Sequence, residues 1–385
     1  MVAVINRLLF VAKKKKGKLR TDFRKNREVR ARHKRVDHEQ GGDNVIDVVR
    51  SERLSGKGRF SRKRTLAGGE VIEDETGTHV MPDVDRTICR LGRVLRVQGL
   101  HSIVRDEAGA MFQCATRRLL KTLSTDQRHV VAAGDIVWIR PEGEGQGIIE
   151  RVEPRHGILS RTSRGRQHVL VANIDLIVIV TSAAEPRLKP NLIDRLLVTA
   201  EKAGIRPVIC INKVDLIEAA DLMPLVGVYA QLGYEVQMVS AATGFGIEQL
   251  RGRLANAESV VTGQSGVGKS SLLNAIEPDL HLRVQTVSEE SQKGRHTTTT
   301  AELIPLSFGG YVVDTPGIRQ FQLWDVIPEE VSGFFRDLRP YVSGCRFPDC
   351  THTHEEDCAV KAAVADGWID TRRYESYVQI QEGDE

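Results

Sequence analysis

One short segment limits the possible folds of this chain more than any other. Residues 263–271 read Gly-Gln-Ser-Gly-Val-Gly-Lys-Ser-Ser, after the apolar run 259–261 and before the apolar run 272–276. A strand, a Gly-rich loop ending in Lys-Ser and a helix, in this order, form the pattern of a phosphate-binding loop. Glycines let successive backbone N–H groups and the helix N-terminus point at a polyphosphate. We therefore predict an α/β nucleotide-binding domain, with Lys269 on the β and γ phosphates and Ser270 on Mg²⁺.

A second pair of segments selects the base. The tetrapeptide Asn212-Lys213-Val214-Asp215 directly follows the apolar run 207–211, and Ser240-Ala241 follows the run 236–239. A carboxylate at 215 can accept two hydrogen bonds from guanine, whereas adenine offers no such pair of donors, and a site built for such a match rejects the wrong base. The sequence therefore predicts GTP rather than ATP.

The order of these motifs is unusual. Both base-recognition segments precede the phosphate loop, and Asp314-Thr315-Pro316-Gly317 comes last. A circular permutation explains this order, because neighbouring chain ends on a compact domain can be joined without changing the sheet. Asp314 is expected to hold Mg²⁺ through water, and the Gly317 N–H to contact the γ-phosphate.

The residue after Gly317 is Ile318, where many GTPases have a glutamine that orients the attacking water. An apolar side chain cannot do this, so another group must act or turnover must be slow. His296, in the polar segment 288–300, is the candidate catalytic residue, together with Lys269. Thr297 or Thr298 is expected to complete the magnesium shell in the GTP state.

A cysteine cluster lies near the C-terminus. Cys345, Cys350, His352 and Cys358 offer the donors of a tetrahedral Cys₃His zinc site, and four strong ligands indicate a structural rather than a catalytic metal. A disulfide is the weaker interpretation, because nothing in the sequence indicates secretion. His354 competes for the fourth position. Cys89, Cys114 and Cys210 lie in strand-like runs and are expected to be buried thiols.

These motifs together resemble a known family, the circularly permuted small ribosomal subunit biogenesis GTPases of the RsgA (YjeQ) type. The resemblance rests on residues 212–215, 263–271, 294–299 and 314–317 and on the cysteine cluster, and it covers about residues 87–380. It implies a partner, the small ribosomal subunit and its rRNA, as well as His296 as the catalytic group and His352 rather than His354 as the zinc ligand.

The N-terminal segment is strongly basic. Residues 1–67 hold 21 Lys or Arg against 7 Asp or Glu, so they carry a net charge of +14 while the chain as a whole carries +4. A basic arm on an acidic body points to a polyanionic partner. Residues 1–12 are interpreted as an upstream extension, with an organelle transit peptide as the alternative, and a merely solubilising tail is the alternative for the arm.

Short runs of alternating apolar residues lie between 87 and 155, at 91–97, 102–105, 111–116, 135–140 and 147–152. Five short strands with Gly turns fit a β-barrel, and the family resemblance favours an OB-fold within that class. Its candidate phosphate contacts are Arg93, Arg96, Arg117 and Arg118.

The predicted fold class is therefore multidomain, with an OB-fold β-barrel, a circularly permuted α/β P-loop GTPase domain and a small, mostly helical zinc-binding domain. The expected boundaries are 1–86 for a disordered basic arm and acidic linker, 87–155 for the barrel, 156–322 for the GTPase and 323–385 for the zinc-binding domain. No apolar run reaches the ~20 residues of a membrane span.

The predicted function is a cytoplasmic, monomeric GTPase that binds the small (30S) ribosomal subunit and assists its late maturation. A GTP-gated RNA-binding scaffold with negligible hydrolysis is the alternative, and Asp215 argues against an ATP-using kinase. The residues expected to contact GTP are Asn212, Lys213, Val214, Asp215, Ser240, Ala241, Gly263, Gln264, Ser265, Gly266, Val267, Gly268, Lys269, Ser270, Ser271, Asp314 and Gly317.

Overall fold

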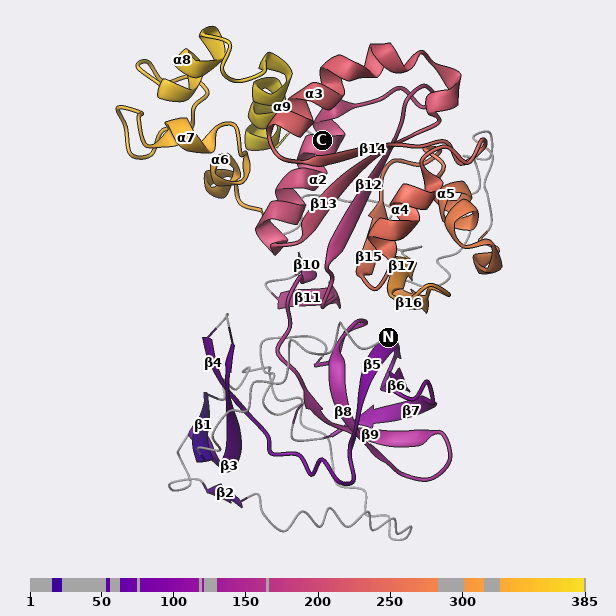
Figure 1. The fold of residues 1–385 in the computed structure, drawn as a ribbon. Coiled ribbons are helices and arrows are strands. Elements are labelled where there is room, and N and C mark those ends of the chain that lie inside the picture. The colour runs from indigo at the N-terminus through magenta and orange to yellow at the C-terminus, as the bar shows by residue number, and fades with distance from the viewer. Residues whose placement is uncertain are drawn as a thin grey trace, which may run out of the picture.

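The chain folds into four parts, which Figure 1 shows as a β-sheet near the N-terminus, a barrel beside it, a central α/β unit and a helical C-terminal unit. The computed structural model describes residues 16–22, 53–55, 63–74, 77–117, 120, 130–163, 166–282, 301–314 and 326–383. Within these ranges, no helix combines the length and the apolar character needed to cross a bilayer.

The N-terminal part contains strands that the sequence did not predict. Strand β3 (Lys63–Asp74) pairs antiparallel with β1 (Lys16–Asp22), β2 (Arg53–Ser55) and β4 (Gly77–Met81). The expectation of disorder for 1–86 therefore differs from the structure in these segments. The reason is that a β ladder is held by backbone hydrogen bonds, which a high density of charged residues does not remove.

A closed five-stranded barrel follows. Its strands are β5 (Arg90–Gln98), β6 (His101–Asp106), β7 (Met111–Thr116), β8 (Ile136–Pro141) and β9 (Gln146–Val152). They pair in the order β5-β6-β7-β9-β8, β8 closes on β5, and only the β7–β9 pair is parallel. Inward-facing residues such as Val94, Val104, Val137 and Ile139 fill the interior. This barrel confirms the OB-type fold that the five alternating runs and the family resemblance predicted.

A hairpin connects the barrel to the α/β unit. It consists of β10 (Leu159–Ser163) and β11 (Arg166–Val171), and Ala133 from the barrel forms a bridge with Val171. This hairpin was not predicted from the sequence. It leads directly into the first strand of the central sheet, so the barrel and the α/β unit are joined over a short stretch of chain (Figure 1).

The central unit has the strand order β14-β13-β12-β15-β17-β16, in which every pair is parallel except β16–β17. Its elements in chain order are β12 (Leu176–Ser182), α2 (Pro190–Ala203), β13 (Arg206–Asn212), η2 (Val214–Leu216), η3 (Ala219–Leu222), α3 (Met223–Gln231), β14 (Glu235–Met238), α4 (Ile247–Leu254), β15 (Glu258–Thr262), α5 (Lys269–Ile276), η4 (Pro278–Leu280), β16 (Glu302–Pro305) and β17 (Tyr311–Asp314). The chain runs outward from β12 through β13 to β14 on one side, and on the other side it goes from β15 to the outer strand β16 and back to β17. Ligands of such sheets bind at the strand ends beside this reversal.

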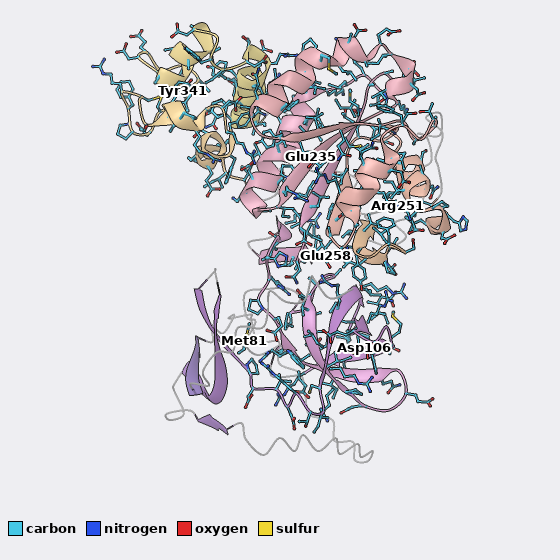
Figure 2. The ribbon with its side chains drawn as sticks, in the orientation of Figure 1. Met81, Asp106, Glu235, Arg251, Glu258 and Tyr341 are labelled. Atoms are coloured by element: carbon cyan, nitrogen blue, oxygen red, sulfur yellow. The ribbon has the colours of Figure 1, made fainter. Side chains whose placement is uncertain are left out.

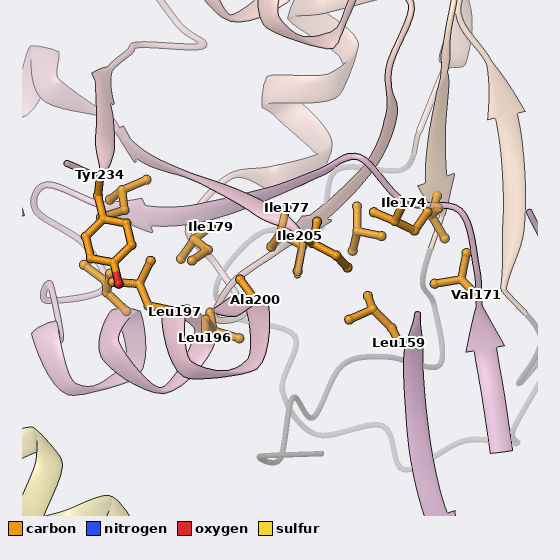
Figure 3. Close-up of a cluster of buried hydrophobic side chains, with 14 of the residues drawn as sticks. Leu159, Val171, Ile174, Ile177, Ile179, Leu196, Leu197, Ala200, Ile205 and Tyr234 are labelled. Atoms are coloured by element: carbon orange, nitrogen blue, oxygen red, sulfur yellow. The ribbon is translucent and has the colours of Figure 1, made fainter. Parts of the chain in front are cut away.

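Two layers of helices cover this sheet. Side chains on β12 alternate, because Ile177 and Ile179 join one core with α2 and α3, whereas Val178 joins the other with α4 and α5. Figure 3 shows the first core, where Leu196 and Leu197 of α2 lie against the sheet. The continuous apolar run of β12, buried at every position, is what a central parallel strand requires.

The C-terminal unit is mostly helical. It contains η5 (Pro328–Glu330), α6 (Val331–Phe334), α7 (Arg339–Val342), α8 (Ala359–Ala365) and α9 (Thr371–Glu382). Its core is built around Phe335, Leu338 and Tyr377, and Val198 from α2 packs into it. Helices α6 and α9 thus lie against the outer side of α2, and α7 and α8 lie farther from it (Figure 1).

A buried ion cluster fastens this unit to the α/β unit. Arg373 on α9, whose side chain is 3% exposed, pairs with Asp194 on α2 and, through two contacts of 2.9 Å, with Asp337. Tyr229 donates a 2.8 Å hydrogen bond to Asp194. Burial raises the pKa of Asp194, and the Arg373 guanidinium opposes that shift.

Removal of this arginine is expected to be costly. We predict that Arg373→Ala lowers the free energy of unfolding by about 3–5 kcal/mol, because two buried carboxylates lose their counter-charge. The neighbouring Arg372 pairs with Asp370 at the surface, and Arg372→Ala is the matched control, expected to cost under about 1 kcal/mol. Urea denaturation followed by tyrosine fluorescence compares the two variants. Equal losses would show that the buried cluster does not hold the units together.

Candidate nucleotide-binding and metal sites

The Gly-rich loop connects β15 to α5 at the strand reversal of the sheet. Gly263 has a φ of +143°, and a Cβ there would lie 2.0 Å from the Val180 carbonyl oxygen. Gly268, the residue before α5, has a φ of +91°, and a Cβ would lie 2.5 Å from Nδ2 of Asn212. Both positions therefore require glycine. The loop is held close to two neighbouring strands, as a phosphate cradle must be.

The loop lysine already lies across the cradle. Nζ of Lys269 donates hydrogen bonds to the carbonyl oxygens of Gly263 at 2.8 Å and Gln264 at 2.7 Å. Ser270 and Ser271 follow it in the first turn of α5, where backbone N–H groups have no partner within the helix. An ammonium beside a helix N-terminus is an arrangement that suits an anion.

The base-recognition segment is tied directly to this loop. Asn212, which is buried, donates from Nδ2 to the Val267 carbonyl at 2.9 Å, and its Oδ1 accepts from the Ala241 N–H at 3.1 Å. Lys213 donates from Nζ to the Gly266 carbonyl at 2.9 Å. The Asn212 side chain thus connects three segments that are far apart in the sequence, so the segments expected to bind phosphate and base lie together.

A cavity of about 310 Å³ adjoins Asp215. Its other lining residues are Val214, Ala219, Met238, Ser240, Thr243 and Phe245. Ser240 is buried, and its hydroxyl accepts a hydrogen bond from the Thr243 N–H at 3.1 Å. Val214, Asp215 and Ser240 were expected here from the sequence, whereas the loop at 243–245 was not, and its only sequence signal is the glycine pair 244 and 246.

Asp314 ends β17, next to the strand that delivers the Gly-rich loop. Its backbone lies opposite Glu302 in the β16–β17 register, and Val313 lies opposite Val260. The position is the one expected for a metal-binding aspartate at the end of a strand. His296, Thr297, Thr298, Gly317 and Ile318 lie outside the described residues, so the roles assigned to them stay predictions.

The four expected zinc ligands come together in the C-terminal unit. The ligand atoms of Cys345, Cys350, His352 and Cys358 all lie within 4.8 Å of one another. Nδ1 of His352 is 3.3 Å from Sγ of Cys345 and 3.5 Å from Sγ of Cys358. The competing His354 is outside this cluster, with a side chain 81% exposed. Three thiols and one imidazole at this spacing fit a tetrahedral zinc ion.

Surrounding groups hold this ligand set in place. Tyr374 donates a 2.8 Å hydrogen bond to the His352 carbonyl, and Tyr377 donates one of 2.6 Å to the Thr351 carbonyl. Burial lowers the pKa of His352, which keeps the ring neutral, and raises the pKa of the Cys350 thiol to about 12. A bound cation would favour the thiolate form, which is the form of cysteine that ligates zinc.

The remaining cysteines are buried in the barrel and the central sheet, as expected. Cys89, Cys114 and Cys210 are free thiols. Burial raises the pKa of Cys114 and that of Cys210 to about 12. Such thiols are unreactive packing residues.

The barrel arginines expected to contact phosphates are engaged within the protein. Arg93 pairs with Glu258 at 2.9 Å, Arg96 with Glu302 at 3.3 Å and Arg117 with Glu150 at 2.9 Å. Arg118 lies outside the described residues. Sequence alone could not show this, because the acidic partners of Arg93 and Arg96 lie more than a hundred residues away in the chain.

Comparison with known proteins places these features in one family. A family model described as RsgA GTPase matches residues 152–324. The Small ribosomal subunit biogenesis GTPase RsgA of Sodalis glossinidius is 42% identical over 295 residues, covering 75% of this chain and 84% of the relative. The protein of the same name from Thermotoga petrophila is 42% identical over 278 residues, covering 71% and 90%.

Two solved structures share the architecture. YjeQ from Thermotoga maritima aligns with a TM-score of 0.64 and 36% identity, over 77% of this chain and 98% of its own. YloQ, described as a circularly permuted GTPase, aligns with a TM-score of 0.60 and 30% identity, over 78% and 97%. The permuted order of motifs and the strand order of the sheet therefore have solved counterparts.

Proposed function

The chain belongs to the family of RsgA GTPases, and we propose that it binds the small (30S) ribosomal subunit and its rRNA and assists late maturation. In this role it hydrolyses GTP to GDP and phosphate. The names of its relatives, which refer to small ribosomal subunit biogenesis, support this partner. The observation that carries the nucleotide part is the double hydrogen bond of Asn212, which joins the guanine-selecting segment to the phosphate loop.

Each residue of this site has a definite task. The loop N–H groups of residues 263–271 and the ammonium of Lys269 bind the phosphates, and the Ser270 hydroxyl and Asp314 hold Mg²⁺, which offsets the phosphate charge. Thr297 or Thr298 completes the metal shell, and the Gly317 N–H contacts the γ-phosphate. The carboxylate of Asp215 accepts from the guanine edge, and the Ala241 segment closes the other side of the base.

The small ribosomal subunit is expected to complete the catalytic site of this chain. Ile318 cannot orient an attacking water, so we expect slow turnover by the isolated protein and faster turnover on the subunit, where His296 is brought to the water. The basic segment 1–67 supports an rRNA contact through counterion release. Cys345, Cys350, His352 and Cys358 would hold one zinc ion with a structural task. We also propose that the chain is a monomer and acts in the cytoplasm, where it would meet a ribosomal partner.

The catalytic histidine is tested by one substitution. We predict that His296→Ala abolishes stimulation by small subunits, by ~10²-fold in rate, while GTP affinity stays unchanged, because the imidazole acts on the water and not on the nucleotide. His281→Ala, at a histidine beyond α5, is the matched control. Phosphate release measured with purified small subunits gives the answer. An unchanged stimulation of the His296 variant would remove it from the catalytic site.

The nucleotide assignment has its own test. Displacement of a fluorescent GDP analogue is measured with GTP and with ATP, and GTP is expected to compete at least ~10²-fold better. Equal competition would contradict guanine selection. The alternative of a GTP-gated scaffold is not favoured by the comparisons, since the matching relatives are named as GTPases.

A further inference from the structure

Strand β5 of the barrel meets the edge of the GTPase sheet at β16. The sheet extends from β16 into β5 through one described pair, in which Arg96 lies opposite Glu302. Glu302 in turn lies opposite Asp314 on β17. The barrel therefore meets the GTPase sheet in the same row that carries the proposed magnesium residue.

The junction between β5 and the GTPase sheet is held firmly at Arg93. Arg93 pairs with Glu258 at 2.9 Å, with side chains only 20% and 14% exposed, and its guanidinium lies 5.5 Å from the centre of the Tyr311 ring. Figure 2 shows Glu258 between the barrel and the α/β unit. The register of β5 shifts between Val94 and Arg96, and the bypassed Leu95 packs into the core of the α/β unit. A β-bulge re-aims a side chain in this way.

The contact at Arg96 is more exposed and longer than the one at Arg93. The Arg96–Glu302 pair measures 3.3 Å, and its side chains are 39% and 44% exposed. Among the residues that the structure describes, Nε of Arg96 is buried and has no hydrogen-bond partner. Exposed ion pairs contribute little to stability and are screened by salt, so another anion can displace Glu302. A phosphate, which arginine binds through two parallel hydrogen bonds, is such an anion.

We propose that the Arg96–Glu302 pair is a breakable latch between the barrel and the Asp314 row, and that an RNA phosphate on the barrel opens it by taking Arg96. The latch is formed in the chain without a partner, which is the state of slow turnover. Opening it releases the Glu302 side chain at the start of β16, a strand that follows Thr297 and Thr298 in the sequence and stays paired with β17. Arg93 and Leu95 keep the barrel attached. Arg96 and Glu302 are thus positioning residues that act through the Asp314 row, and the inference rests on the proposed GTPase function.

The test weakens the latch without touching Arg96. Glu302→Gln is expected to raise the turnover of the isolated full-length chain about tenfold and to reduce the stimulation by small subunits by the same factor, with GTP affinity unchanged. The matched control is Glu142→Gln, because Glu142 pairs with Arg140 at 3.1 Å with exposures of 46% and 36%, entirely within the barrel. It should stay within about twofold of the wild type.

A charge exchange separates the latch from a general loss of stability. The double variant Arg96→Glu with Glu302→Arg restores the pair but places a carboxylate where the phosphate would bind. Its isolated turnover should return to the wild-type value, and its stimulation should stay below one tenth of the wild-type factor.

An isolated Glu302→Gln chain with wild-type turnover, or an equal rise in Glu142→Gln, would overturn the latch. A wild type that hydrolyses GTP but ignores subunits contradicts the proposed partner instead. The turnover of the isolated Glu302→Gln chain still decides the latch in that case.

Discussion

Asp215→Asn is expected to weaken GTP binding by ~10²-fold or more. The substitution replaces a carboxylate, which accepts two hydrogen bonds from guanine, with an amide that offers one acceptor and one donor. The donor then faces the donors of the base, and a site with such an unmatched polar group loses affinity strongly. Xanthine carries an oxygen where guanine has the amino group, so XTP should regain part of the loss. Titration calorimetry with GTP and XTP measures both effects.

The control for this prediction lies nearby. Asp221 is an exposed carboxylate in η3, and Asp221→Asn makes the same chemical change away from Asp215. It should bind GTP as the wild type does. If both variants bind GTP with wild-type affinity, Asp215 does not read the base, and guanine selection would have to come from the Ser240-Ala241 segment.

Cys350→Ser is expected to remove the zinc and to loosen the helical unit at 326–383. Binding of a structural zinc ion contributes folding free energy of roughly 10–16 kcal/mol in small domains, and a serine hydroxyl is a poor replacement for a thiolate. GTP affinity should change little, because the ligand cluster lies on the far side of α2 from the phosphate loop (Figure 1). Elemental analysis and limited proteolysis of the C-terminal unit measure the two effects.

Cys89→Ser is the matched control, since Cys89 is a buried thiol of the barrel. It should retain one zinc ion per chain and an intact C-terminal unit. A freshly purified wild type without zinc, with Cys345, Cys350 and Cys358 reactive toward a thiol reagent, would contradict a structural metal.

Much of the fold could be predicted from local patterns. The barrel strands alternate with period two, and β12 is apolar throughout, so both were predictable from the sequence. The hairpin β10–β11 and the sheet around β3 were not, because charged and polar residues dominate them and only their backbone pairing defines them. Helix α4 was also missed. Its eight residues carry two arginines and a glycine, which weaken the helical pattern.

The site shows the same division. Motifs such as residues 263–271 and the cysteine cluster have spacings that chemistry fixes, so the amino-acid sequence alone identifies their residues. The contacts between motifs were not predictable. Asn212 binds Val267 and Ala241, and Arg96 binds Glu302, and each pair is brought together by sheet topology across a long stretch of chain. Such pairs leave no signal in a single sequence.

This chain belongs to a family of GTPases, and we propose that the small ribosomal subunit accelerates its hydrolysis of GTP. The acceleration is tested most directly by phosphate release from γ-labelled GTP and γ-labelled ATP, with the full chain alone and with purified small subunits. We expect no release from ATP above the blank and slow release from GTP alone. Small subunits should raise the GTP rate ~10²-fold, a gain that needs about 3 kcal/mol of barrier lowering, and large subunits should leave it unchanged. Equal rates for GTP and ATP, or a GTP rate that no subunit changes, would contradict this expectation.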